Sequence, residues 1–159
     1  MRYDEAVELN ELMKLLGMRH RARATELLSE LGLSIGQEQL LLELDRNGPS
    51  TQTQLAIAAS CEPPTVTIAV RKLEAAGIVT RAPSPTDARA IVVRLTDTGK
   101  ALIPQFRTAW QRLATETFQD MTRAERDATV SMLRRMTANL SRTDRKPRPR
   151  DAFERFEQP

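Results

Sequence analysis

The sequence is poor in the residues that build most catalytic and metal sites. It has one cysteine and one histidine in 159 residues, and it contains no glycine-rich phosphate loop and no cluster of carboxylates. No catalytic constellation can be assembled from so few reactive side chains, so we expect no enzyme activity, no metal site and no cofactor. A single cysteine also excludes an intrachain disulfide framework and is typical of a reducing cytoplasm.

Long apolar runs are missing as well. No run approaches the roughly 20 residues that span a bilayer, and the acidic, amphipathic start MRYDEAVELNELM lacks the layout of a signal peptide. Hydrophobic residues make up 40% of the chain but aromatic residues only 4%, a balance typical of a helix-rich soluble protein. We expect a cytoplasmic protein that does not contact a membrane.

The net charge is also small. The formal charge is +3, and residues 142–159 carry six basic and four acidic side chains, so the rest of the chain has a net charge of only +1. Composition therefore gives almost no evidence for or against a polyanionic partner, and an argument for DNA binding depends on where the charges lie.

Over most of the sequence the apolar residues recur at helical spacing. It predicts a long first helix from residue 3 to about 31 and a second helix after a capping box of Ser34 and Gln37. A second capping box, Thr51 with Gln54, starts a short third helix.

The stretch PPTVTIAVRKLEAAG, residues 63–77, predicts a fourth helix that begins at proline and ends at glycine. Its apolar stripe is Val66, Val70 and Leu73. The opposite face mixes β-branched and basic residues, where a plain solvated face would favour better helix formers such as Glu, Ala and Gln. This composition indicates that the outward face binds a partner.

After Gly77 the period changes. IVTR and AIVVRL are predicted strands, joined by the loop APSPTDAR. A long helix follows from Thr96 or Asp97, with Pro104 near its beginning, and a last helix follows a capping box of Thr122 and Glu125. The tail from residue 141 is charged and rich in proline, and we expect it to be disordered.

Three helices followed by a two-stranded wing describe a winged helix-turn-helix. We therefore predict a mainly α fold with a small two-stranded β wing, flanked by dimerisation helices. The predicted division is an N-terminal dimerisation helix (1–33), a winged DNA-binding domain (34–96), C-terminal dimerisation helices (97–140) and the tail (141–159). The helix from residue 64 is the predicted recognition helix, and its first N–H groups are expected to bind a phosphate.

Several motifs in this order resemble the MarR family of bacterial transcriptional regulators. They are LSIGQEQLLLEL, TQTQLA, TVTIAVRKLEAAGIVTR and PTDARAIVVRLTDTGKAL. The resemblance covers residues 5–140 and implies a homodimer that binds a pseudo-palindromic double-stranded DNA operator, most often as a repressor. It further implies that Asp87 holds Arg89, which reaches toward the minor groove from the wing.

The predicted DNA-binding residues lie on the third helix, the recognition helix and the wing. They are Thr51, Gln52, Pro64, Thr65, Thr67, Ile68, Arg71, Lys72, Arg81, Asp87 and Arg89.

Two residues depart from the family pattern. Ile68 stands where a polar or basic residue is common, and Ala88 stands where a second basic residue is common in the wing. Both changes remove polar DNA contacts. They favour an alternative function, in which the winged module has lost DNA binding and antagonises another regulator by protein–protein contact.

The resemblance also implies a site for a small anionic or phenolic ligand. Arg19, His20 and Arg23 are the candidates for this effector pocket, and the alternative is a polar stripe on the first helix. Cys61 precedes the recognition helix, where it is either a redox sensor or a small packed residue; the adjacent Glu62 disfavours a thiolate.

Overall fold

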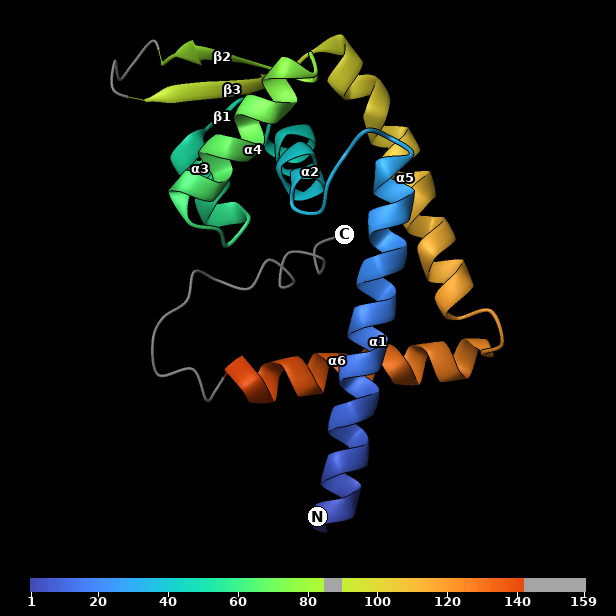
Figure 1. The fold of residues 1–159 in the computed structure, drawn as a ribbon. Coiled ribbons are helices and arrows are strands. Elements are labelled where there is room, and N and C mark those ends of the chain that lie inside the picture. Colours follow the sequence, from blue (N-terminus) through green and yellow to red (C-terminus); the bar gives the residue numbers. More distant parts are fainter. Residues whose placement is uncertain (85–89, 142–159) are drawn as a thin grey trace.

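The computed structural model describes residues 1–84 and 90–141. Helices α2, α3 and α4 and a small sheet form a compact head, from which α1 and α5 extend side by side (Figure 1). Helix α6 follows a turn at the far end of α5. The elements are α1 (Tyr3–Ser29), α2 (Gln37–Asn47), β1 (Ser50–Thr51), α3 (Gln52–Ala58), α4 (Pro63–Ala75), β2 (Val79–Pro83), β3 (Ile91–Leu95), α5 (Asp97–Thr117) and α6 (Arg123–Ser141).

The predicted fold class is confirmed, with one strand that the sequence analysis did not find. β2 and β3 pair antiparallel as the predicted wing, with Val79 opposite Leu95 and Pro83 opposite Ile91. The additional strand β1 pairs with the other edge of β3, so the strand order is β1-β3-β2. With only two residues, β1 is too short to show alternating hydrophobicity.

Three of the predicted helix caps form as expected. The Thr51 side chain accepts a hydrogen bond from the Gln54 N–H, and the Gln54 side-chain oxygen accepts one from the Thr51 N–H. Thr96 caps α5, and Thr122 forms a capping box with Glu125 before α6. Pro104 lies inside α5, where it cannot donate a backbone hydrogen bond.

The start of α2 differs from the prediction. The Ser34 N–H does donate to the side chain of Gln37 at 2.8 Å, which is half of a capping box. The N-cap, however, is Gly36, whose φ of 95° is left-handed and interrupts the helix geometry before Gln37. Residues 34–36 therefore form a turn that precedes the helix.

A core of leucine and valine unites the head with the ends of α1 and α5. Leu28, Leu55, Val70 and Val93 are all fully buried in it. A second, smaller cluster lies between α1 and α5 and contains Ala24, Leu27, Ala109 and Leu113. The two alanines allow the helices to approach closely at this point.

Two glycine motifs meet where α4, β2 and α5 join. Gly77 ends α4 with a φ of 70°, a conformation that favours glycine. The Thr96 hydroxyl lies 2.7 Å from the Gly77 carbonyl oxygen and also accepts the N–H of Gly99 at 3.0 Å. Gly99 packs directly on the Ile78 carbonyl, so the motifs LEAAG and LTDTG form one junction between the helix and the wing.

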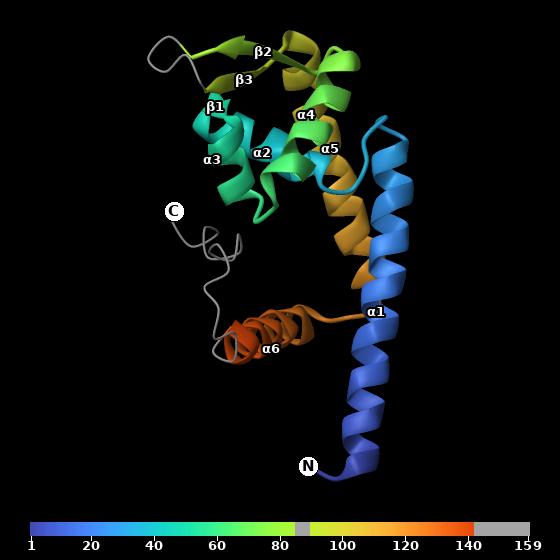
Figure 2. The same cartoon turned by 60° about the vertical axis from the view of Figure 1, so that its left-hand side comes forward.

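The distal part of α1 and all of α6 have no buried residues. Figure 2 shows that α6 lies apart from α1. Large apolar side chains are exposed on both helices: Val7, Leu9, Leu12, Met13, Leu15, Leu16 and Met18 on α1, and Val130, Met132, Leu133, Met136 and Leu140 on α6. Within the described ranges, no helix is long and apolar enough to cross a membrane.

Candidate nucleic-acid interface

Helix α4 presents the face that the sequence analysis singled out. Val66, Val70 and Leu73 are at most 1% exposed and hold the helix against the core. On the other side Thr65, Ile68, Arg71 and Lys72 are exposed. Ile68 is 57% exposed, so its apolar side chain lies open on this face.

The start of α4 is less open than expected. Pro63 and Pro64 have no N–H, and the N–H groups of Thr65 and Val66 both donate to the carbonyl oxygen of Glu62, at 3.0 and 3.3 Å. Bonds within the helix thus occupy the N–H groups of Thr65 and Val66, which counts against the expected phosphate contact at this helix end, but the contact itself stays a prediction.

Threonine side chains differ in availability across this region. The half-buried Thr67 donates its hydroxyl to the Pro63 carbonyl oxygen at 3.0 Å, so this hydroxyl has only its lone pairs left to accept with. The Thr51 hydroxyl forms the cap of α3. Thr65 is exposed on α4 and is the threonine best placed to donate to a phosphate.

Gln52 opens α3 beside the cap. Its Nε2 atom is buried and, within the part of the chain that the structure describes, has no hydrogen-bond partner. An unbonded buried amide is costly, and contact with DNA or water would satisfy it.

Arg81 on β2 is paired with the recognition helix. Its Nε and Nη2 atoms lie 2.7 and 2.6 Å from one carboxylate oxygen of Glu74, and both side chains are about one third exposed. Hydrogen bonding from Arg81 is the main reason that the pKa of Glu74 is below its ordinary value, and Arg71 adds to it. Glu74 therefore ties the wing to α4 through Arg81, a contact that the sequence does not reveal.

The wing strands lead to the tip where Asp87 and Arg89 were predicted. Both residues lie outside the described residues. The Ser84 N–H donates to the Ala90 carbonyl oxygen at 2.8 Å, so the strands stay paired up to the base of the tip.

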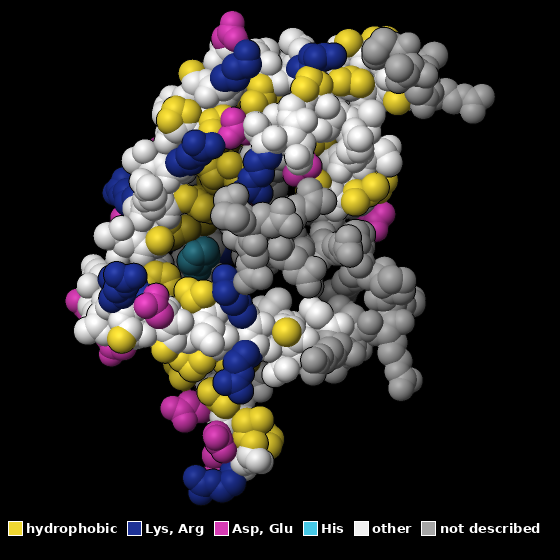
Figure 3. Space-filling model, turned by 180° about the vertical axis from the view of Figure 1, so that it is seen from behind, with side chains coloured by type: hydrophobic (Ala, Val, Ile, Leu, Met, Phe, Trp, Pro, Cys, Tyr) yellow, Lys and Arg dark blue, Asp and Glu magenta, His cyan; other side chains and the backbone are white. Residues whose placement is uncertain are grey.

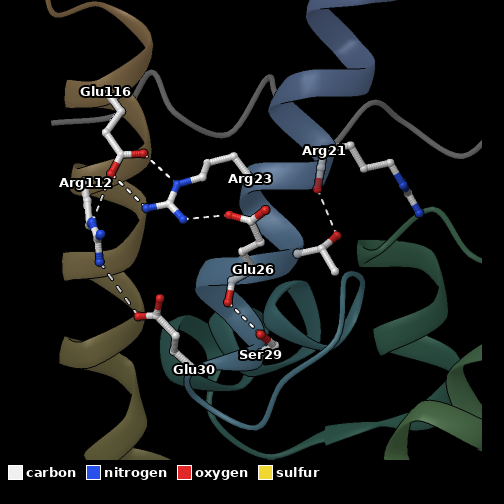
Figure 4. Close-up of polar contacts among 8 residues, drawn as sticks. Arg21, Arg23, Glu26, Ser29, Glu30, Arg112 and Glu116 are labelled. Atoms are coloured by element: carbon white, nitrogen blue, oxygen red, sulfur yellow. Dashed lines mark hydrogen bonds and ion pairs between the residues drawn. The ribbon is translucent and has the colours of Figure 1, made fainter.

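The candidate effector residues on α1 fall into two groups. Arg19 and His20 are exposed; on the face shown in Figure 3, hydrophobic and basic side chains surround the chain's single histidine. Arg23 instead points to α5, where it forms a two-bonded fork with Glu116 (Figure 4). The hydrogen bond from Arg23 has the largest effect on Glu116; together with a smaller contribution from Arg112 it outweighs the opposing effect of burial and lowers the pKa to about 2.

Cys61 is half-buried beside the core, and its thiol lies 3.2 Å from the Ala59 carbonyl oxygen. This environment is that of a packed side chain. No group of three or more His, Cys, Asp and Glu side chains that could hold a metal ion occurs among the described residues.

Three packed helices, with α4 exposed at the surface and a paired wing behind it, define a winged helix-turn-helix protein. The family model described as "MarR family" matches residues 33–91. The HTH-type transcriptional repressor NicR of Pseudomonas putida is 28% identical over 134 residues, which cover 84% of this chain and 85% of NicR.

Two solved structures are similar over most of the chain. Apo MarR from E. coli superimposes with a TM-score of 0.69 at 25% identity, covering 80% of this chain and 95% of MarR. BpsR of Bordetella bronchiseptica, whose DNA binding is regulated by 6-hydroxynicotinic acid, superimposes with a TM-score of 0.70 at 25% identity, covering 82% and 98%. The chain belongs to the MarR family of winged helix-turn-helix transcriptional regulators.

Proposed function

We propose that this protein is a transcriptional repressor that binds a pseudo-palindromic duplex operator as a homodimer and is released by a small-molecule effector. The observation that carries the proposal is the exposed face of α4. Within the described ranges, Arg71 and Lys72 on that face form no ion pair, so both are available to a nucleic acid. A helix of this kind beside a wing is the element that enters the major groove.

The residues of this face are suited to different contacts. The long fork of Arg71 can bond a guanine edge with two hydrogen bonds, which provides about 1–3 kcal/mol of discrimination. Thr65, in the first turn of α4, is suited to a phosphate. Ile68 can offer only apolar contact, for which the methyl group of thymine is the matching base feature.

The homodimer is supported by the exposed apolar side chains of α1 and α6. A helix with an apolar stripe that its own protomer does not cover must bury the stripe elsewhere. All of α6 and residues 3–22 of α1 are in this position. A second copy of the chain offers the same two helices, so the apolar faces of both copies can be buried together across a twofold axis. Residues 1–33 and 97–140 would then supply the dimer contacts, and residues 34–96 the DNA contacts.

The effector is proposed to be a small anionic or phenolic compound. NicR is named as a repressor, and BpsR responds to an aromatic carboxylic acid. In this chain Arg19 and His20 provide exposed hydrogen-bond donors on α1. Arg23 is engaged with Glu116 and contributes less to such a site.

The test is a binding selection on randomised duplexes with four proteins: the wild type and the variants Arg71→Ala, Thr65→Ala and Ile68→Ala. Arg71→Ala should relax the base preference at one symmetric pair of positions, whereas Thr65→Ala should weaken binding to all duplex sequences evenly. Ile68→Ala should reduce the binding affinity most for duplexes that carry thymine at the contacted position. Four identical sets of preferences would mean that this face reads no bases.

Such a result would favour the second candidate function, a module that antagonises another regulator by protein–protein contact. The 57% exposure of Ile68 at the centre of the face is the observation in its favour. Binding to duplex DNA that weakens steeply with salt separates the two functions, because only contacts with phosphates release counterions.

A further inference from the structure

A cluster of charged side chains ties α1 to α5. The Arg23 guanidinium donates from Nε and Nη2 to the two carboxylate oxygens of Glu116, at 2.7 and 2.9 Å. Its remaining nitrogen, Nη1, donates to Glu26 at 2.7 Å. Arg112 donates to the same Glu116 at 2.9 Å, and its other end lies 3.8 Å from Glu30 (Figure 4). Every guanidinium nitrogen of Arg23 is therefore bonded.

The cluster lies at one particular place in the fold. On the side of the head, α1 and α5 pack through the small cluster that includes Ala24 and Ala109. On the other side, no α1 residue before Arg23 is buried, and α5 ends one residue after Glu116. The Arg23–Glu116 fork thus lies at the outer end of the buried contact between α1 and α5, and the two helices diverge away from the head in Figure 1.

The fork restricts the angle between α1 and α5 more than an ordinary surface ion pair would. Two parallel hydrogen bonds between planar groups have a defined geometry, which a single lysine contact lacks. Arg112 and Glu26 hold the two partners from their own helices, so part of the ordering cost is already met within each helix.

The length of α1 converts a small change of angle into a large displacement. From Arg23 to the start of the helix at Tyr3, the arm is about 30 Å long. A tilt of about 10° at the joint would move its end by about 5 Å, which exceeds the rise of about 3.4 Å per base pair.

We propose that Arg23 and Glu116 are positioning residues that determine the operator spacing: their fork sets the angle between α1 and α5, which is packed on the head, and so the distance between the two α4 helices of the dimer. The inference rests on the proposed function, because it requires a dimer that binds two half-sites. It concerns the separation of those half-sites and leaves the base contacts to α4.

The first test measures the distance between the heads without DNA. Ile57, which is 58% exposed on α3, is replaced by cysteine in a Cys61→Ser background and spin-labelled, so that each dimer carries one pair of labels. The distance distribution should be narrow for this parent and should broaden or shift in Glu116→Gln and Arg23→Gln. The double variant should change no more than either single variant, because both remove the same contact.

Asp97→Asn is the matched control. It also removes one negative charge from α5, but among the described residues Asp97 forms an ion pair only with Lys100 of the same helix. Its distance distribution should equal that of the parent. Arg23→Lys, which keeps the charge and loses the fork, should behave like Arg23→Gln; it replaces the Gln variants if these do not fold.

The second test measures the spacing preference directly. Duplexes carry two copies of the selected half-site at the preferred spacing, or one base pair closer or farther apart. The preference of the wild type for one spacing should fall about two- to fivefold in Glu116→Gln, the size expected for loss of an exposed ion pair, and should not change in Asp97→Asn.

Unchanged distance distributions or an unchanged spacing preference in both fork variants would overturn the inference and leave the proposed function intact. If the labelled parent protein gives no measurable distance between two labels, no dimer forms. That result, or a wild type that binds no duplex at any spacing, would overturn the proposed function and the inference together.

Discussion

The junction between α4, the wing and α5 makes a strong prediction at Gly99. A Cβ atom on this residue would overlap the carbonyl oxygen of Ile78 and would lie 3.1 Å from a methyl group of Leu95. The carbonyl belongs to the backbone and also accepts the N–H of Thr96 at 3.0 Å, so it cannot rotate away as a side chain could. Gly99→Ala must therefore push α5 away from the turn that follows α4.

The expected cost is worked out from two opposing effects. Forcing a methyl group into a packed site costs about 1–3 kcal/mol, and displacement of Thr96 adds about 1 kcal/mol for each hydrogen bond lost. Alanine recovers about 0.5–1 kcal/mol because it is a better helix former than glycine. We expect Gly99→Ala to lower the free energy of unfolding by roughly 1–3 kcal/mol.

Urea unfolding at a fixed protein concentration measures this change, and Gly17→Ala is the control. Gly17 lies inside α1, and a Cβ there would meet nothing within 4 Å in its own protomer. This substitution should raise the stability by about 0.5–1 kcal/mol, as expected for helix propensity alone. A Gly99→Ala variant as stable as the wild type, or a shift of the same sign as for Gly17→Ala, would refute the close packing of the junction.

Three further substitutions test other contacts of the head in the same assay. Burial raises the pKa of Glu38, which is 5% exposed and accepts the Gly36 N–H at 2.6 Å. The charged form of Glu38 therefore lowers the stability of the folded protein at neutral pH, and Glu38→Gln should raise the urea midpoint at pH 7. This gain should vanish below the ordinary glutamate pKa of 4.5, where the carboxyl group is protonated in both the folded and the unfolded protein. Glu74 has the opposite sign, because Arg81 lowers its pKa: Glu74→Gln should lower the midpoint at pH 7, and this loss should shrink as the pH falls below 4.5. Thr51→Ala removes the cap of α3 and should cost about 0.5–2 kcal/mol; an unchanged midpoint would mean that the cap does not stabilise the head.

The helices could be predicted because their buried faces are strongly apolar. Val66, Val70 and Leu73 repeat at the helical period and are all buried, so the same pattern that predicts α4 also predicts which side faces outward. The caps at Thr51 and Thr96 depend on neighbours within three residues, which the sequence displays directly.

The parts of the fold that were missed depend on distant residues or on backbone geometry. Strand β1 exists because β3 lies beside it, and two residues carry no periodic signal. The turn before α2 depends on the left-handed Gly36, whereas Ser34 and Gln37 alone match an ordinary capping box.

The same distinction applies to the candidate site. The exposed face of α4 follows from helical geometry, but the partners of its neighbours do not. Arg23 was a candidate for effector binding because of its basic surroundings, yet its main partner, Glu116, is 93 residues away in the sequence. Packing of α1 on α5 brings the two together, and no local pattern contains that information.

The central claim is that two copies of α4 enter successive major grooves of one duplex. Methylation of guanine N7 by dimethyl sulfate reports on the major groove, so the measurement is a protection pattern on the duplex recovered from the binding selection. Two α4 helices in successive grooves should protect two patches on one face of the DNA, about one helical turn apart and related by the operator symmetry. A single protected patch, or a bound duplex with every guanine N7 still reactive, would contradict it.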